Sequence, residues 1–384
     1  MTPLEAATHV DPYPYYAQLR QKSDLYFDSG LGLWVACGAS AVEAILQHPD
    51  CRVRPAHEPV PPAIAKGAAG RVFAGLMRMN EGTHHQCPRA VIEPALLEVP
   101  ADQVMALTSS LAGRAEHSAE GLNRLIFNVP VSVLAALMGF KQEQLPTVAK
   151  LTRDFVACLS PLSNAAQLHN AHVAATGLSQ MLDMLLSEGQ QRSNFLSDMC
   201  NFFKASDWQD HDALIANLIG LLSQTCEASA GLIGNTLVAL QQRPELLEAL
   251  TRTPELVNEL IAEVARHDSP VQNTRRFVAR QCTIGDSVLQ AGDTVLLLLA
   301  SANRDASANP VPDSFLLKRG QRRSFSFGHA RHQCPGQPIA LTIAAHTLSL
   351  LLQQPEAPLR QPLSWSYLPS LNGRIPLFSN SLES

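Results

Sequence analysis

The chain has 384 residues, enough to bury a large core and still enclose a ligand pocket. Apolar residues make up 46% of the chain and charged residues only 16%, which argues against a mainly disordered protein. The formal net charge of −5 gives no reason to expect a nucleic-acid partner.

The sequence shows no membrane or secretion signal. No apolar run approaches the roughly 18 residues that a membrane span requires, and the N-terminus lacks a basic start followed by an apolar stretch. The eight cysteines are scattered and none forms a C-x-x-C pair, which argues against a zinc ribbon or a disulfide framework. We therefore expect a cytoplasmic protein with reduced thiols that binds no membrane.

Helices are predicted to dominate the first two thirds of the chain. Residues 25–27 and 33–37 flank a Ser-Gly-Leu-Gly turn and predict a β-hairpin, and the prolines of residues 54–64 predict an irregular loop. Residues 162–243 contain no proline, which predicts several successive helices. The last of them, residues 212–242, is predicted to cross the core and to end at Pro244.

The last third of the chain adds a second predicted hairpin, at residues 282–284 and 287–289 around Gly285-Asp286. Strand signals are otherwise few, and the sequence shows no repeat, no low-complexity segment and no linker between independent domains. We therefore predict a mainly α-helical protein with small β-sheets, folded as a single domain over residues 1–384.

One cysteine, Cys334, differs from the others in its surroundings. An aromatic residue, a glycine and several basic residues precede it, and an Ala/Leu/Ile run with helical spacing follows. Cys334 is therefore expected where a loop enters a helix, a place that favours an anion and should depress the pKa of the thiol. Three interpretations remain open on this context: a structural cysteine, a zinc site with His329 and His332, or a thiolate ligand to haem iron.

The whole chain favours the third interpretation. Residues 327–336, Phe-Gly-His-Ala-Arg-His-Gln-Cys-Pro-Gly, resemble the haem-binding loop of the cytochromes P450, which reads F-G-x-G-x-H/R-x-C-x-G. The matching positions are Phe327, Gly328, His332, Cys334 and Gly336. Ala330 departs, because the family usually has glycine there. Residues 302–315 resemble the segment that precedes this loop.

Other segments agree with the family in the same order along the chain. His85 and Arg89 resemble the H-x-x-x-R of the family's helix C. Glu263 and Arg266 resemble the E-x-x-R pair of helix K, and Arg276 lies where the family supplies an arginine to a haem propionate. The resemblance extends over nearly the whole chain.

The resemblance implies the cytochrome P450 fold, with haem b (iron protoporphyrin IX) between the long helix and the helix after the cysteine loop. Cys334 is the implied ligand of the iron, and the implied propionate contacts are His85, Arg89, Arg276 and His332. The implied activity is that of a monooxygenase. Such an enzyme inserts one oxygen atom of O2 into its substrate and releases the other as water.

The long helix departs from the family where protons are delivered. The family has an acid followed by a threonine, whereas this chain has Glu227, Ala228 and Ser229. Glu227 can relay a proton, but Ala228 cannot donate a hydrogen bond, and Ser229 points about 100° away around the helix. Thr225, ordered water or a substrate hydroxyl is expected to complete the relay.

The E-x-x-R pair is implied to brace the loop that bears the cysteine. A further arginine usually completes this brace, but Ser314 occupies its commonest place, so Arg304 or Arg319 is the expected substitute.

Electrons are expected to come from a separate ferredoxin and ferredoxin reductase, since no flavin-binding segment is visible. Arg322, Arg323 and Arg331 are expected to form a basic patch that docks the ferredoxin. The expected protein is a monomer.

The positions that line the family's pocket correspond here to residues near 76–79, 221–222 and 271–274. Their apolar character implies a mainly apolar small molecule, such as an intermediate of secondary-metabolite biosynthesis. Two alternatives stay open: a cytochrome P450 that performs non-hydroxylating or peroxide-driven oxidation, and a noncatalytic haem sensor or carrier. Ala228 and Ala330 favour the noncatalytic alternative, whereas Glu227 argues against it.

Overall fold

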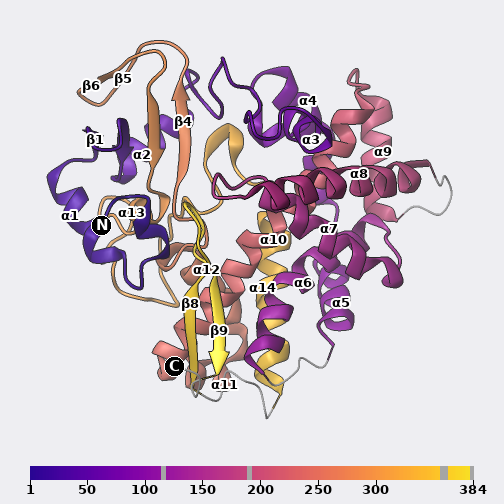
Figure 1. The fold of residues 1–384 in the computed structure, drawn as a ribbon. Helices are drawn as coiled ribbons and strands as arrows, with labels where there is room; N and C mark the ends of the chain where they lie inside the picture. The colour runs from indigo at the N-terminus through magenta and orange to yellow at the C-terminus, as the bar shows by residue number, and fades with distance from the viewer. Residues whose placement is uncertain (114–117, 188–192, 355–361, 381–384) are drawn as a thin grey trace.

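The computed structural model describes residues 1–113, 118–187, 193–354 and 362–380 (Figure 1). Helices predominate in these residues, as predicted. The helices are α1 (Tyr13–Lys22), α2 (Ala39–Gln47), α3 (Ala68–Gly75), α4 (Thr83–Leu97), α5 (Ala101–Ala112), α6 (Ala119–Met138), α7 (Leu145–Ala157), α8 (Ala165–Ser187), α9 (Asn194–Ala205), α10 (His211–Gln242), α11 (Pro244–Arg252), α12 (Val257–His267), α13 (Leu299–Asn303) and α14 (Gln337–Gln353).

The strands are short. They are β1 (Leu25–Asp28), β2 (Leu33–Ala36), β3 (Cys51–Arg52), β4 (Thr274–Val278), β5 (Cys282–Ile284), β6 (Ser287–Leu289), β7 (Thr294–Leu297), β8 (Leu363–Tyr367) and β9 (Pro376–Asn380). One sheet has the order β1-β2-β7-β4-β3, in which only β2 and β7 are parallel, and two further sheets are the hairpins β5-β6 and β8-β9. Both hairpins predicted from the sequence are confirmed.

The five-stranded sheet and the longer helices lie in different parts of the molecule. Figure 1 shows the five-stranded sheet with α1, α2 and α13 on one side of the view, and the longer helices gathered on the other. The predicted run of helices in residues 162–243 is confirmed as α8, α9 and α10, although residues 188–192 lie outside the described part of the chain.

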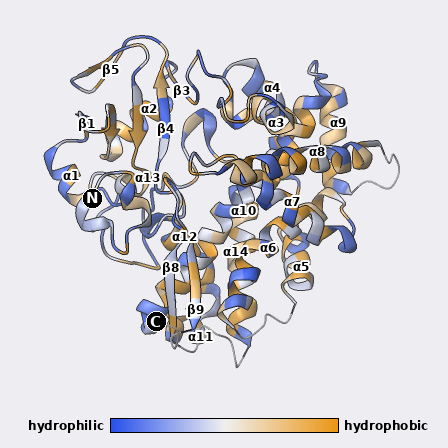
Figure 2. Ribbon diagram, viewed as in Figure 1, coloured by the Kyte–Doolittle hydropathy of each residue, from blue (hydrophilic) through white to orange (hydrophobic). Residues whose placement is uncertain are grey.

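The central helix is α10, which packs against α3, α6, α12 and α14. It begins where the Asp210 side chain accepts a hydrogen bond from the Ala213 N–H at 2.9 Å, and it ends just before Pro244. Most of its residues are buried, and Figure 2 shows apolar residues along it and its neighbours. The prediction of one long core helix is confirmed.

Helix α6 is long and apolar enough to cross a membrane, by length and composition. Its most apolar window is 67% buried, and it packs against α5, α7 and α10. We therefore describe it as a core helix of the fold, whose apolar surface is used in helix packing.

Candidate active site

Cys334 lies between a 3₁₀ turn, Ala330–His332, and the start of α14, where Gly336 is the N-cap. Its backbone N–H donates to the carbonyl of Phe327 at 2.8 Å, which folds the loop back on itself. The Cys334 side chain is exposed, whereas six of the other cysteines are buried. The position at the entrance of a helix is therefore as predicted.

The prediction of a depressed Cys334 pKa is wrong for this structure. Burial among surrounding protein raises the pKa of Cys334, and the N–H of Gly336, the charge of Arg89 and the N–H of Gln337 offset this only in part. A Cβ on Gly336 would lie 3.9 Å from the Cys334 Sγ, and Gly336 lines a pocket between α14 and α10, so the thiol lies beside internal space.

Two residues of the cysteine loop have positive φ, namely Gly328 at 73° and Ala330 at 54°. A Cβ on Gly328 would approach the His332 carbonyl oxygen to 3.0 Å, so that position requires glycine. Ala330 adopts the left-handed conformation that the family's glycine would adopt without strain. The mismatch in the motif is therefore a local energetic cost and leaves the loop path intact.

The zinc interpretation of this loop is not supported. His329 Nε2 lies 2.8 Å from Gln47 Nε2, and His332 Nε2 lies 3.3 Å from Glu81 Oε2. Within the described ranges, the side chains that gather as potential metal ligands are His48, Cys51 and Cys282, and this group does not include Cys334.

Two buried nitrogen atoms near the loop lack a hydrogen-bond partner: Arg276 Nε on β4 and His332 Nδ1. Burial lowers the pKa of Arg276 to about 10 and also lowers the pKa of His332. A buried cation and a buried imidazole with unused nitrogen atoms are costly unless an anion completes them. The two atoms fit the carboxylates of a haem, so the prediction for both residues agrees with the local chemistry.

The other two predicted propionate contacts lie on α4. The buried His85 ring lies 4.3 Å from the His332 ring between centroids, and burial with the nearby charge of His332 lowers the pKa of His85 to about 4. Arg89 donates to both carboxylate oxygens of Glu93 and to the carbonyls of Arg331 and Gln333, at 2.7–3.1 Å. Arg89 therefore ties α4 to the cysteine loop, and its contact with a propionate stays a prediction.

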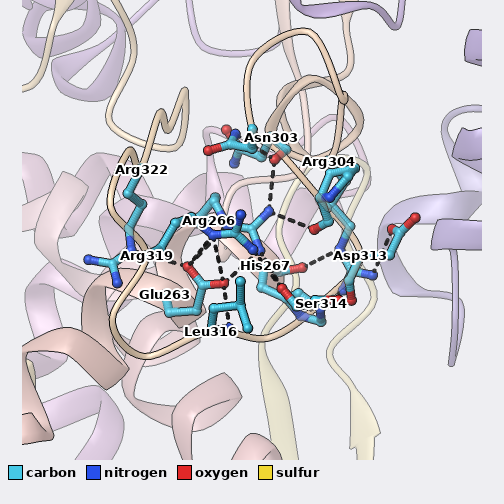
Figure 3. A network of polar contacts seen from close by, with 12 residues as sticks. Glu263, Arg266, His267, Asn303, Arg304, Asp313, Ser314, Leu316, Arg319 and Arg322 are labelled. Atoms are coloured by element: carbon cyan, nitrogen blue, oxygen red, sulfur yellow. Dashed lines mark hydrogen bonds and ion pairs between the residues drawn. The ribbon is translucent and has the colours of Figure 1, made fainter.

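The brace around Glu263 is fully buried at its centre (Figure 3). Glu263 binds Arg266 in a two-point contact at 2.7 and 3.1 Å, and it accepts the Leu316 N–H at 3.0 Å. Arg266 also donates to the carbonyls of Asn303 and Pro312 at 3.0 and 2.8 Å. Helix α12 thereby fixes the segment that leads to the cysteine loop.

The missing arginine of the brace is identified. Arg319 Nε lies 3.3 Å from Glu263 Oε1, as one of the two predictions stated. The other candidate, Arg304, instead donates to the His267 carbonyl at 2.8 Å, so that alternative is wrong. Sequence reasoning missed Arg322, which lies 3.1 Å from Glu263 and 2.9 Å from Glu259.

The predicted basic patch is therefore wrong in part. Arg322 belongs to the brace, with 16% of its side chain exposed. Arg323 pairs with Glu43, and Arg331 lies 3.0 Å from Glu81 while also donating to the carbonyls of His48 and Cys51. Each arginine of the patch has an acidic partner, because the same loop must be held against the sheet and α12.

The middle of α10 interrupts the buried surface of that helix. Thr225, Glu227 and Ala228 are half-buried and Gln224 is exposed, whereas Ser229 is buried. Burial raises the pKa of Glu227, and the charge of Arg78 lowers it. The Thr225 hydroxyl donates to the Leu221 carbonyl at 2.9 Å. Thr225 lines an internal pocket, and Ser229, four residues later, lies on the same face of α10. Glu227 lies about 160° around the helix from both of them.

An apolar pocket lies between this stretch of α10 and the cysteine-loop helix. Its lining is Leu96, Leu134, Leu221, Thr225, Gly336, Ile339, Ala340 and Ile343. The long helix and the start of α14, between which the resemblance places the haem, thus contribute to one pocket. Of the predicted substrate-contact residues, Leu221 lines it.

Sequence reasoning also missed two charged side chains near the site. Glu81 precedes α4 and binds His332 and Arg331, whose hydrogen bonds outweigh the effect of burial and lower its pKa to about 2. Arg78 lies in segment 76–79, whose apolar residues were predicted to line the substrate pocket. The signal that could have found Arg78 is that it is a charged residue within an otherwise apolar segment.

The comparisons agree with this geometry. The family model for "Cytochrome P450" matches residues 238–357, which contain the brace and the cysteine loop. The cytochrome P450 monooxygenase PikC of Streptomyces venezuelae is 26% identical over 365 residues, covering 90% of this chain and 84% of the relative. The vitamin D(3) 25-hydroxylase of Pseudonocardia autotrophica is 30% identical over 275 residues, covering 71% and 62%.

Solved structures share the fold over almost the whole chain. P450BioI, in complex with acyl carrier protein ligated to hexadec-9Z-enoic acid, superposes with a TM-score of 0.79 at 24% identity, covering 96% of this chain and 97% of that one. CalO2 superposes with a TM-score of 0.82 at 20% identity, covering 98% of both chains. The chain belongs to the cytochrome P450 family and is a cytochrome P450 monooxygenase. Membership implies a haem, a substrate and redox partners.

Proposed function

We propose that the protein binds haem b through the Cys334 thiolate and inserts one oxygen atom of O2 into a mainly apolar small molecule. The observation that carries this proposal is the exposed Cys334 thiol at the entrance of α14, beside two buried nitrogen atoms that lack partners. Residues 1–384 would act as a single domain, as a monomer in the cytoplasm.

The residues that would hold the haem come from three parts of the fold. Cys334 would bind the iron, and Arg276 and His332 would donate to the propionates. His85 lies against His332 and would orient it, while Arg89 would hold the loop and assist with a propionate. When bound, a thiolate-ligated haem supplies the capacity to activate dioxygen with two electrons and two protons.

The protein's part in the reaction would be to move protons and exclude water. The Glu227 carboxyl is the strong acid–base group on the accessible side of α10, and its raised pKa suits proton donation. Neither Thr225 nor Ser229 stands in the place of the missing threonine. Ordered water held by these two hydroxyls would therefore connect Glu227 with the substrate. Ala228 leaves room for a substrate hydroxyl or water there.

The substrate would be an intermediate of secondary metabolism. The pocket bounded by Leu96, Leu134, Leu221 and Ile343 lies between α10 and α14, where the haem would bind, so its apolar lining would hold the haem ring. The apolar part of the substrate would lie beyond the haem, against residues near 76–79 and 221–222. Support also comes from relatives: PikC is named a monooxygenase, and the Pseudonocardia protein is named a hydroxylase of vitamin D(3). Both names are compatible with oxidation of a largely apolar compound.

Electrons would come from a ferredoxin and its reductase. The ferredoxin would dock near the cysteine loop, where Arg323 keeps 42% of its side chain exposed despite its pairing with Glu43. Arg331 is less exposed, at 26%, so the docking surface would be smaller than the sequence suggested. Salt should weaken this association because it screens the charges involved.

The direct test of the proposed reaction is isotope labelling. The purified protein, with a surrogate ferredoxin and ferredoxin reductase, is given a substrate that changes its haem spectrum, under ¹⁸O2. Mass spectrometry should show one ¹⁸O atom in the product. Oxidised product without ¹⁸O would contradict oxygen insertion from O2 and would favour desaturation or coupling.

A further inference from the structure

Three potential metal ligands gather at the edge strand of the five-stranded sheet, in a group to which Cys334 does not belong. His48 is the C-cap of α2, Cys51 lies on β3, and Cys282 begins β5. One ring nitrogen of His48 and the two sulfur atoms all lie within 4.8 Å of one another. A histidine and two cysteines offer the nitrogen and sulfur donors that Zn²⁺ prefers in proteins.

The backbone brings these side chains together from segments that are far apart in sequence. Cys51 lies on β3, which pairs with β4. After β4, the Ala279 N–H donates to the Asp50 carbonyl at 2.7 Å, and Arg280 Nε lies 2.8 Å from the Asp50 carboxylate. The turn between β4 and β5 is thereby held against the residue before Cys51, and the chain returns Cys282 to that place.

The spacing of the donor atoms fits one tetrahedral ion. Two atoms bound to the same Zn²⁺ at about 2.0–2.3 Å lie roughly 3.3–3.8 Å apart, so the three donors need side-chain shifts on the order of 1 Å. Cys51 and Cys282 are buried, whereas His48 is half-buried. The histidine side of the group therefore gives the ion a way in and leaves a place for water as a further ligand.

The charges of such a site would balance. Burial raises the pKa of Cys51 to about 12 and also raises the pKa of Cys282, so both thiols are neutral until a cation binds. Zn²⁺ would displace one proton from each thiol. Two thiolates, one neutral imidazole and the ion then carry no net charge, which allows the site to stay buried.

Binding would end one hydrogen bond of His48. Its Nδ1 accepts the Asp50 N–H at 3.1 Å. Whichever ring nitrogen binds the ion, Nδ1 loses the free lone pair that accepts this bond, because it then holds either the ion or the proton. Asp50 is half-buried, so water can take the place of the imidazole at its N–H.

We propose that His48, Cys51 and Cys282 bind one Zn²⁺ ion, with water as the fourth ligand. The ion would be structural and would join the end of α2 to β3 and to the β5-β6 hairpin. It would also fix the segment against which the cysteine loop packs, because Arg331 donates to the carbonyls of His48 and Cys51, both at 3.1 Å. Zinc binding at this place requires no haem, so the inference does not depend on the proposed function.

The experiment measures the zinc content of the purified, haem-loaded protein, kept reduced, incubated with Zn²⁺ and dialysed. Inductively coupled plasma mass spectrometry should find about one zinc ion per chain. X-ray absorption at the zinc edge should show two sulfur neighbours at about 2.3 Å and nitrogen or oxygen neighbours at about 2.0 Å. His48→Gln and Cys282→Ser should each weaken zinc affinity at least about 100-fold in competition with a coloured chelator, since even partners outside the ligand set contribute 10–100-fold.

The matched control is Cys158→Ser, which changes a buried cysteine at the end of α7 outside this group and should keep the zinc. His48→Gln alters a half-buried side chain, and its circular dichroism should match that of the wild type. A wild type that retains no zinc would overturn the inference, as would unchanged zinc affinity in His48→Gln and Cys282→Ser. A disulfide between Cys51 and Cys282 in the reduced protein would overturn it too, because the sulfur atoms would then be unavailable to the ion.

Discussion

At the scale of single residues, Glu227 is the acidic group whose position in the fold best suits proton transfer. It lies half-buried in the middle of α10, and its pKa is raised by burial. Ser229 follows two residues later, is buried, and points about 160° away from Glu227 around the helix.

We predict that Glu227→Gln slows substrate turnover by about 10²-fold, since a positioned acid–base group contributes at least that much. Ser229→Ala should change the rate by less than about threefold, because the Glu227 carboxyl, the acid–base group of this stretch, remains in place. The measurement is the turnover rate and the fraction of electrons recovered in product. Wild-type rate and coupling in Glu227→Gln would rule out a relay through this carboxyl.

Ala330 offers a second test at the same scale. Its φ of 54° is in the left-handed region, which costs a residue with a Cβ roughly 1–2 kcal/mol. Ala330→Gly should therefore raise the free energy of unfolding by about 1 kcal/mol without changing the haem spectrum. Urea unfolding followed by circular dichroism measures this, with Ala112→Gly, inside the last turn of α5, as a control that should destabilise. A loss of stability in Ala330→Gly would mean that the loop does not have this conformation in solution.

The residues predicted from the sequence are those that belong to a local motif. Cys334, Glu263 and Arg266 could be assigned because their spacing along the chain is itself the signal. Arg322 could not, because it pairs with Glu263, which is far away in sequence and is brought near only by the folded chain. The same limit applies to the pKa of Cys334, which depends on how much protein surrounds the loop.

At the scale of elements, the brace joins α12 to the segment before the cysteine loop. Arg319 has 3% of its side chain exposed, and it donates to the Pro310 and Ser314 carbonyls at 2.6 and 2.7 Å as well as contacting Glu263. Its removal would leave a buried acid and two carbonyls short of donors. The brace therefore stabilises the loop as well as the helix.

We predict that Arg319→Ala lowers the free energy of unfolding by about 3 kcal/mol or more, since breaking a buried ion pair strands its partner. Arg252→Ala is the control, because Arg252 pairs with Glu248 at the surface and should cost less than about 1 kcal/mol. Denaturation followed by circular dichroism and haem absorbance measures both. Equal effects in the two variants would contradict a structural role for the brace.

Beside the brace, His267 makes stability depend on pH. Arg304 lies 2.8 Å from its Nδ1, the Asp313 carbonyl lies 3.0 Å from its Nε2, and burial with the charge of Arg304 lowers its pKa to about 2. The unfolded chain therefore binds a proton below about pH 6.5 that the folded chain does not bind. The stability contribution is complete above that pH and is lost as the pH falls toward 2.

We expect the melting temperature of the wild type to fall more steeply between pH 7 and pH 5 than that of His267→Gln, because each pH unit costs up to about 1.4 kcal/mol from this group. The glutamine can keep both hydrogen bonds without titrating. His57→Gln, in an exposed loop, should behave as the wild type. Parallel pH profiles for wild type and His267→Gln would show that His267 titrates normally.

The elements predicted correctly were those with local signals. The two hairpins have turn residues between short apolar runs, and α10 has a proline-free apolar pattern that ends at Pro244. The parallel pairing of β2 with β7 and the pairing of β3 with β4 were not predictable, because each joins segments more than 200 residues apart. The sheet order depends on the whole fold.

At the scale of the whole molecule, the fold brings three distant segments to one place. Helix α4 supplies His85, β4 supplies Arg276, and the loop before α14 supplies Cys334. Two buried nitrogen atoms there, Arg276 Nε and His332 Nδ1, have no hydrogen-bond partner. Helix α10, which carries Glu227, lies across from α14. The central claim is that a haem with Cys334 as its ligand fills this place.

The measurement that tests this claim most directly is the absorption spectrum of the reduced protein with carbon monoxide. The wild type should show the red-shifted Soret band of a thiolate-ligated haem, and Cys87→Ser, which changes a half-buried cysteine on α4, should show the same band. Cys334→His should lose the red shift. A wild type that binds no haem, or a red-shifted band that persists in Cys334→His, would contradict the account.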